Sequence, residues 1–89
     1  MSFVIKKIWA FVAIDPEDGD EGIIGLNIPG TRSLSIPAIG ADWTRVREIY
    51  GVVEQQMRHH KDIQWRVIEL STRRDVTDEV KDLIEMEKS

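Results

Sequence analysis

The sequence has no cysteine, and this absence excludes several kinds of chemistry at once. Without a thiol the chain has no disulfide framework, no thiolate zinc site, no iron–sulfur cluster and no cysteine nucleophile. We therefore expect a protein that suits the reducing cytoplasm and carries no cofactor.

Long hydrophobic runs are also missing. The longest, IWAFVAI at residues 8–14, is far shorter than the roughly 20 apolar residues that span a bilayer. Acidic residues follow this run, where a signal peptide would have a small-residue cleavage site. We expect neither a membrane span nor a signal peptide.

Basic residues are outnumbered by acidic ones, 12 to 16, and the negative charge is concentrated. The net charge is −4 at pH 7, which argues against general nucleic-acid binding. Residues 15–22, DPEDGDEG, hold five carboxylates and no basic residue, so the rest of the chain carries a net charge of +1. Basic residues outnumber acidic ones between positions 42 and 74.

The residues that are present indicate a single folded domain over residues 1–89. Of these residues 42% are apolar and 31% are charged, which is typical of a globular chain. A domain of this size buries only about two-thirds of its unfolded surface, so the core is modest and oligomerisation would add to it.

Three strands are predicted between residues 3 and 39. Residues 3–14 are β-branched and aromatic, with apolar side chains on both faces, which indicates a strand covered on both sides. Residues 23–28 and 32–39 are the next two strands, separated by the turn dipeptide Pro29-Gly30. The acidic stretch then forms the turn of a hairpin between the first two strands.

The main helix is predicted within residues 42–60. Asp42 suits the N-cap, and apolar residues follow it at intervals of three and four. The members of this stripe are Trp43, Val46, Ile49, Tyr50, Val53 and Met57. Gly51 lies inside the helix, where a small residue lets a helix lie close to a sheet.

A fourth strand at residues 63–70 and a terminal helix at residues 76–87 complete the chain. The order β-β-β-α-β-α predicts an α+β fold with an antiparallel sheet of about four strands and the main helix packed on one face. The second apolar face of the first strand then needs a cover. Either the terminal helix or a second copy supplies it, and we expect a homodimer because that helix is short.

The stretch FVAIDPEDGDEGIIGLNIPG, with GAD opening the helix, resembles the N-terminal module of HicB-type antitoxins. The shared features are an acidic hairpin, a second strand ending in Pro-Gly, and a helix soon afterwards. Two features differ. Trp43-Thr44-Arg45 follows GAD where the family has a Gly-Asp-Thr/Ser start with acids and Ala, and the 15 residues from Asp75 have room for one helix but not for a DNA-binding extension.

A second resemblance covers more of the chain. The stretches IWAFVAIDPEDGDEG, GADWTRVREI and RVIELSTRRDV are similar to parts of small bacteriophage and prophage proteins. That resemblance implies a protein that binds a host protein or a small signalling molecule, including roles in counter-defence. It brings no catalytic motif.

The acidic stretch does not match a calcium loop, which needs ligands at positions 1, 3 and 5, Gly at 6 and Glu at 12. Counted from Asp15, position 6 is Asp20 and position 12 is Leu26; counted from Asp18, position 12 is Pro29. A solvated turn is the simplest interpretation, with weak divalent binding or an acidic surface for a protein partner as alternatives. That surface would consist of Asp15, Glu17, Asp18, Asp20 and Glu21.

The histidines do not indicate a metal site. His59 and His60 are adjacent, so on a helix their side chains point about 100° apart and do not chelate one ion. Together with Arg58 and Lys61 they suit the negative end of the helix dipole. No serine lies in a nucleophile elbow, so we expect no metal, no catalytic residue and no enzyme.

The arginines offer the remaining candidate site. Guanidinium groups and a helix N-terminus suit a phosphate or a carboxylate. The predicted ligand contacts are Arg45, Arg66, Arg73 and Arg74, with Trp43 either stacking on a nucleotide-like ligand or packing in the core.

These patterns predict a non-enzymatic binding protein that acts on a host protein or sequesters an anionic small molecule. The alternative, which follows from the first resemblance, is an antitoxin-like partner of a small toxic enzyme that uses the acidic hairpin to occlude the active site.

Overall fold

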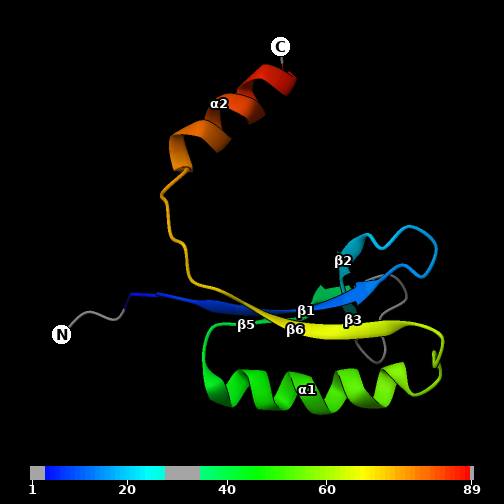
Figure 1. Ribbon diagram of the computed structural model, residues 1–89. Coiled ribbons are helices and arrows are strands. Elements are labelled where there is room, and N and C mark those ends of the chain that lie inside the picture. Colours follow the sequence, from blue (N-terminus) through cyan, green and yellow to red (C-terminus); the bar gives the residue numbers. More distant parts are fainter. Residues whose placement is uncertain (1–3, 28–34, 89) are drawn as a thin grey trace.

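The computed structural model describes residues 4–27 and 35–88 and has the predicted α+β architecture, an antiparallel sheet with two helices (Figure 1). The elements are β1 (Ile8–Ile14), β2 (Glu21–Ile23), β3 (Gly25–Asn27), β4 (Ser35–Pro37), β5 (Ile39–Gly40), α1 (Trp43–Met57), β6 (Gln64–Leu70) and α2 (Thr77–Lys88).

Strand β1 is the centre of the main sheet. Along one side it pairs antiparallel with β6 over its whole length, from Ile8 opposite Leu70 to Ile14 opposite Gln64. Along the other side it pairs antiparallel with β2 and with β5. Strand β6 therefore forms one edge of this sheet, as the last strand of the chain to join it.

The second and third predicted strands are each divided in two. The division falls at Ile24, between β2 and β3, and at Ala38, between β4 and β5. Strands β2 and β5 join the main sheet, whereas β3 and β4 pair with each other in a second, two-stranded sheet. The predicted Pro29-Gly30 turn and the first residues of the predicted strands at 3–14 and 32–39 lie outside the described residues.

Backbone hydrogen bonds explain where the strands divide. The Phe11 N–H donates to the Ala38 carbonyl at 2.9 Å, and the Ile24 N–H donates to the Phe11 carbonyl at 2.8 Å. The Ala38 N–H in turn donates to the Ile24 carbonyl at 2.8 Å. Phe11, Ile24 and Ala38 are all buried. These hydrogen bonds keep their backbone groups paired at the junction, although Ile24 and Ala38 lie between strands.

Helix α1 covers one face of the sheet (Figure 1). Its buried residues recur at helical spacing and meet Phe11, Ile24 and Ala38 from the strands. They are Val46, Ile49, Val53 and Met57. The predicted stripe is thus confirmed except at its two aromatic positions, Trp43 and Tyr50, which are exposed.

A glycine does permit a close approach between α1 and the sheet, but it is not Gly51. A Cβ placed on Gly51 would meet nothing within 4 Å, because this position faces away from the sheet. On Gly40, in β5, a Cβ would lie 2.9 Å from Val46 Cγ2, closer than real Cβ contacts allow. The expectation for Gly51 is therefore wrong, and Gly40 has that role.

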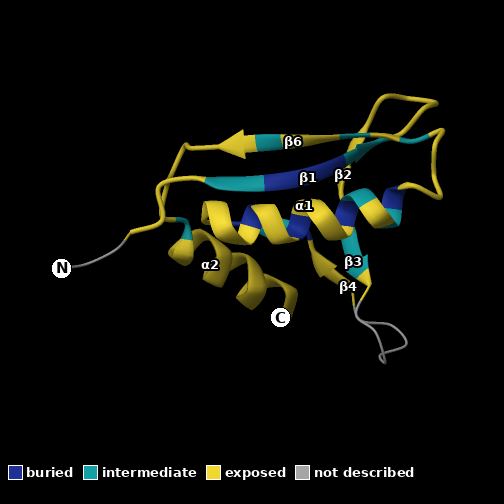
Figure 2. Cartoon of the chain, turned by 90° about the horizontal axis from the view of Figure 1, so that it is seen from below, coloured by how far each residue is buried: buried dark blue, intermediate teal, exposed yellow. Residues whose placement is uncertain are grey.

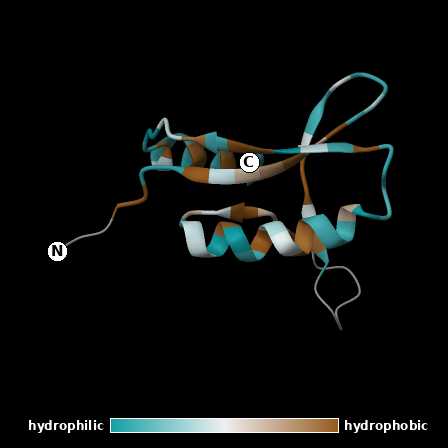
Figure 3. Cartoon of the chain, turned by 60° about the horizontal axis from the view of Figure 1, so that its bottom comes forward, coloured by the Kyte–Doolittle hydropathy of each residue, from teal (hydrophilic) through white to brown (hydrophobic). Residues whose placement is uncertain are grey.

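Helix α2 stands away from the rest of the molecule, at the end of an extended segment (Figure 1). None of its residues is buried (Figure 2). The radius of gyration is 16.0 Å, whereas a compact chain of this length has about 12 Å. Hydrophobic and hydrophilic residues both occur along the two helices (Figure 3). In α2 the apolar residues Val80, Leu83 and Ile84 recur at helical spacing, so this helix also carries an apolar stripe.

Candidate functional site

A groove along one side of α1 combines two exposed aromatic rings with a guanidinium group. It is lined by Trp43, Val46, Arg47 and Tyr50 and has a volume of about 330 Å³. We call these four residues the helix groove. Trp43 is 65% exposed and Tyr50 is 46% exposed, large fractions for side chains of this kind.

The local sequence explains why the groove has this shape. The Asp42 carboxylate accepts a hydrogen bond of 2.7 Å from the Arg45 N–H, so the helix starts at Trp43 and the indole lies in the first turn. Arg47 and Tyr50 follow four and seven positions later, on the same side of the helix. Val46 forms the floor, because its side chain is buried against the sheet.

The wall formed by Tyr50 is held in place by the core. Its ring centroid lies 5.5 Å from that of Trp65 and 6.4 Å from that of Phe11, both in tilted arrangements. Such offset aromatic pairs are favourable beyond the area they bury. One side of the Tyr50 ring is therefore anchored while the other remains accessible.

Arg47 is available to a partner. None of the ion pairs among the described residues includes its guanidinium group. Arg47 is the charged residue among those that line the groove. The groove can therefore hold an apolar side chain beside a negatively charged group.

No family model, no curated protein and no solved structure matches this chain.

The arginines predicted as ligand contacts do not converge on one pocket. Arg45 lies on α1, where its side chain passes over Gly40. Arg66 lies opposite Val12 in β6, on the face of the sheet that points away from α1, since Phe11 and Val67 form the neighbouring pair on the α1 side. Of the predicted contacts, only Trp43 belongs to the helix groove.

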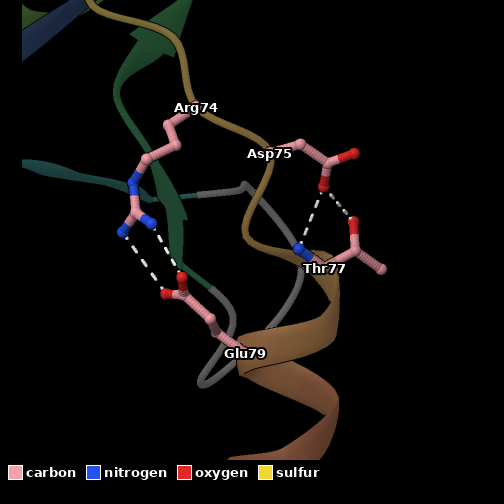
Figure 4. A network of polar contacts seen from close by, with 4 residues as sticks. All are labelled: Arg74, Asp75, Thr77 and Glu79. Carbon is pink, nitrogen blue, oxygen red and sulfur yellow. Dashed lines mark hydrogen bonds and ion pairs between the residues drawn. The ribbon is translucent and has the colours of Figure 1, made fainter.

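Arg73 and Arg74 lie in the extended segment before α2. Together with the first turns of α2 they border an open hollow of about 640 Å³ to which the sheet contributes nothing. Arg74 is already paired there: its guanidinium group donates two hydrogen bonds to Glu79, at 2.7 and 3.3 Å (Figure 4). Arg73 takes part in none of the ion pairs among the described residues.

The same segment forms hydrogen bonds to the first residue of α2. The Asp75 carboxylate accepts hydrogen bonds from the Thr77 hydroxyl at 2.6 Å and from the Thr77 N–H at 3.0 Å (Figure 4). These two donors hold the pKa of Asp75 below its ordinary value of 3.8.

The acidic stretch at residues 15–22 forms the predicted hairpin turn between β1 and β2. The Asp15 carboxylate accepts from the Glu17 N–H at 2.8 Å, and the Asp18 carboxylate accepts from the Asp20 N–H at 2.9 Å. Gly19 has a φ of +78°, which closes the turn in a conformation that suits glycine. Two of the five carboxylates thus stabilise the turn itself, and all five are exposed.

No group of three His, Cys, Asp or Glu side chains in residues 4–27 and 35–88 is arranged to hold a metal ion. Within the same residues no polar or charged side chain is buried. No helix of the described chain has both the length and the apolar character to cross a membrane.

Sequence reasoning missed Arg47 and Tyr50 as site residues. The available signal was the spacing of Trp43, Arg47 and Tyr50, which places two aromatic residues and an arginine on one side of a helix. That spacing is also what a core stripe produces, so the helical period assigned Tyr50 to the core and left Trp43 as either a core residue or a ligand contact.

Proposed function

We propose that this chain is a non-enzymatic binding protein and that the helix groove holds a segment of a protein partner. The observation that carries the proposal is the exposure of Trp43 beside Arg47 and Tyr50. Trp, Tyr and Arg are the residues that most often dominate the binding energy of protein interfaces. From the resemblance to phage and prophage proteins, we take the partner to be a host protein.

The chemistry of the groove suggests what the partner presents. An apolar side chain would pack between Trp43 and Tyr50 over Val46, and a carboxylate or a phosphate would pair with Arg47. An anionic small molecule with an aromatic ring offers the same two groups. A free ligand and a peptide segment are distinguished by the stoichiometry and the mass of what the purified protein retains.

The test compares four forms of the tagged protein in a host-cell extract: the wild type, Trp43→Ala, Arg47→Ala and the control Val52→Ala. Val52 is exposed on α1 but does not line the groove, so its replacement leaves the groove intact. We expect one protein to be retained by the wild type and by Val52→Ala and lost with the two groove variants. Titration of that purified partner should show a loss of affinity of tenfold or more for Trp43→Ala, since central interface aromatics contribute about 2 kcal/mol or more.

Native mass spectrometry of the purified wild type tests the small-molecule form of the proposal. A bound anion that is absent from Arg47→Ala would support it. A partner or ligand that binds both groove variants as tightly as the wild type would contradict the assignment of this groove.

The acidic hairpin supports a second candidate function, the antitoxin-like one. All five of its carboxylates are exposed, and Glu17, Asp20 and Glu21 take part in none of the ion pairs among the described residues. A basic active-site cleft of a toxic enzyme would pair with such a surface. Replacing these three residues by lysine should then abolish a complex that Trp43→Ala leaves unchanged. A complex that is lost with Trp43→Ala and kept by the lysine variant would favour the groove.

A further inference from the structure

The face of the main sheet opposite α1 is apolar and partly exposed to solvent: Ile23 and Leu70 are exposed, whereas Ala10 and Val12 in the central strand are buried. Because residues paired across the strands share a face, the register places eight apolar side chains on this side. We call these residues the open face: Ile8, Ala10, Val12, Ile14, Ile23, Ile39, Ile68 and Leu70. No element of the described chain lies over them (Figure 1).

An antiparallel sheet with one face in water has polar residues on that face. Here the only polar residues in the paired positions are Arg66, Gln64 and Glu21, and the last two lie at the hairpin end. Ile23 and Leu70 are exposed by half or more. The composition of the open face is therefore that of a covered surface.

Helix α2 likewise exposes an apolar surface. Val80, Leu83 and Ile84 lie on one side of the helix and are 45%, 60% and 47% exposed. A helix of 12 residues is marginal in water unless an apolar side packs on something. The chain thus exposes both a sheet face that no helix covers and a helix, α2, whose apolar side packs on no sheet.

The segment between β6 and α2 directs the helix away from its own sheet. Residues 71–76, STRRDV, contain neither glycine nor proline, and the structure forms no turn in them. Arg74 and Asp75 bind the first turn of α2 through Glu79 and Thr77, which fixes the direction of the helix relative to the end of this segment (Figure 4).

Charge complementarity also favours contact between the two surfaces. Helix α2 carries five acidic and two basic residues, a net charge of −3. The polar residue nearest the centre of the open face is Arg66, opposite Val12, and Arg73 follows the same edge of the sheet in the exposed segment. An acidic amphipathic helix therefore fits this face better than a basic one would.

We propose that two copies of this chain form a two-fold symmetric dimer in which α2 of each copy packs its apolar stripe on the open face of the other. A second copy is the occupant because each chain holds both halves of the interface, and a two-fold axis satisfies both at once. Helix α2 is about 18 Å long. The two contacts between α2 and an open face would together bury roughly 1,200 Å² of surface, the area at which stable interfaces begin.

This inference does not depend on the helix groove, which lies on the other side of the sheet. Its test is the oligomeric state of the full chain, measured by native mass spectrometry and sedimentation over a range of protein concentrations. We expect a dimer for the wild type and for the control Val52→Glu, whose exposed side chain lies on α1 outside both surfaces. Leu83→Glu with Ile84→Glu, and separately Leu70→Glu, should raise the dimer dissociation constant at least tenfold.

Disulfide trapping identifies which surfaces meet, because the chain has no cysteine of its own. A copy with Ile84→Cys mixed with a copy with Leu70→Cys should give a cross-linked heterodimer under oxidising conditions. In the chain that carries both substitutions, a disulfide formed within one chain would show that α2 folds onto its own sheet. Such a result would overturn the proposal.

Two other results would also overturn it. A dimer that survives all the glutamate substitutions would point to pairing through the free edge of β6. A wild-type chain that remains monomeric at every concentration would mean that a different protein covers the open face.

Discussion

The close contact between α1 and the sheet at Gly40 is possible because this residue has no side chain. A Cβ there would lie 2.9 Å from Val46 Cγ2 and 3.3 Å from the Val46 N atom. We predict that Gly40→Ala lowers the free energy of unfolding by about 1–3 kcal/mol, because the buried helix has to shift outward. Urea denaturation measures the change.

Two companion variants show whether the cause is this contact. Gly22→Ala is the matched control, since a Cβ there meets nothing within 4 Å, and it should change stability by less than about 0.5 kcal/mol. Val46→Ala removes the opposing methyl group, so the double variant should lose less than the sum of the two single losses. Additive losses would show that Gly40 acts through something other than Val46.

Single residues were also where the sequence was least informative about the site. The 3.6-residue period grouped Trp43 and Tyr50 with Val46 and Val53, and the structure buries only the two valines. The reason is geometric. An apolar stripe wider than the surface it covers leaves its margins in water, and the width of the sheet beneath α1 is not encoded in the helix itself.

At the scale of elements, the predictions that held were those that depend on local physics. Asp42 caps α1, residues 63–70 contain β6, and the acidic stretch forms a hairpin turn. The division of the second and third strands was not predictable, because Ile24 and Ala38 leave the strand only to bond with Phe11, far away in the sequence. Long-range backbone pairing of this kind has no local signal.

The start of α2 provides a pH-dependent element. The pKa of Asp75 lies below its value of 3.8 in an unfolded chain, because Thr77 donates two hydrogen bonds to the carboxylate. A lowered folded-state pKa means that this contribution to the helix is complete above about pH 4 and is lost as the pH falls through the folded-state value. We predict that the first turn of α2 frays on acidification in that range.

Backbone chemical shifts of residues 77–80, followed by NMR from neutral pH to below pH 4, measure the fraying. The comparison that isolates Asp75 is Asp75→Asn, which keeps an acceptor oxygen but does not ionise. In this variant the shifts should depend less on pH. Identical curves for the two forms would show that the fraying does not come from Asp75.

At the scale of the whole molecule, the order of elements and the antiparallel sheet followed from the sequence, whereas the position of α2 did not. The apolar stripe of Val80, Leu83 and Ile84 correctly predicted a helix, and a stripe on a small protein implies that something packs against it. The pattern could not say what that is, because a stripe has the same spacing whether it meets its own sheet or another copy. Of the two helices in the described residues, α1 reaches the core and α2 does not.

That single core has Phe11 at its centre. The side chain is fully buried, its ring contacts Tyr50 and Trp65, and its backbone forms the junction with Ile24 and Ala38. We predict that Phe11→Ala lowers the free energy of unfolding by about 3–5 kcal/mol. Small domains have only about 5–15 kcal/mol in total, so this variant should be marginally folded.

Val67→Ala is the control for this prediction, because Val67 lies directly opposite Phe11 in the sheet but is 38% exposed. It should cost less, since the Val67 side chain is smaller than that of Phe11 and is only partly buried. Urea unfolding followed by circular dichroism reports α1 and the sheet, and tryptophan fluorescence reports Trp9 and Trp65, which pack against the core. In Phe11→Ala both signals should show their unfolding transition at the same urea concentration, because one cluster holds α1, the main sheet and the β3–β4 pair together. Separate transitions would show that α1 and the main sheet unfold as independent units and that the core around Phe11 does not couple them.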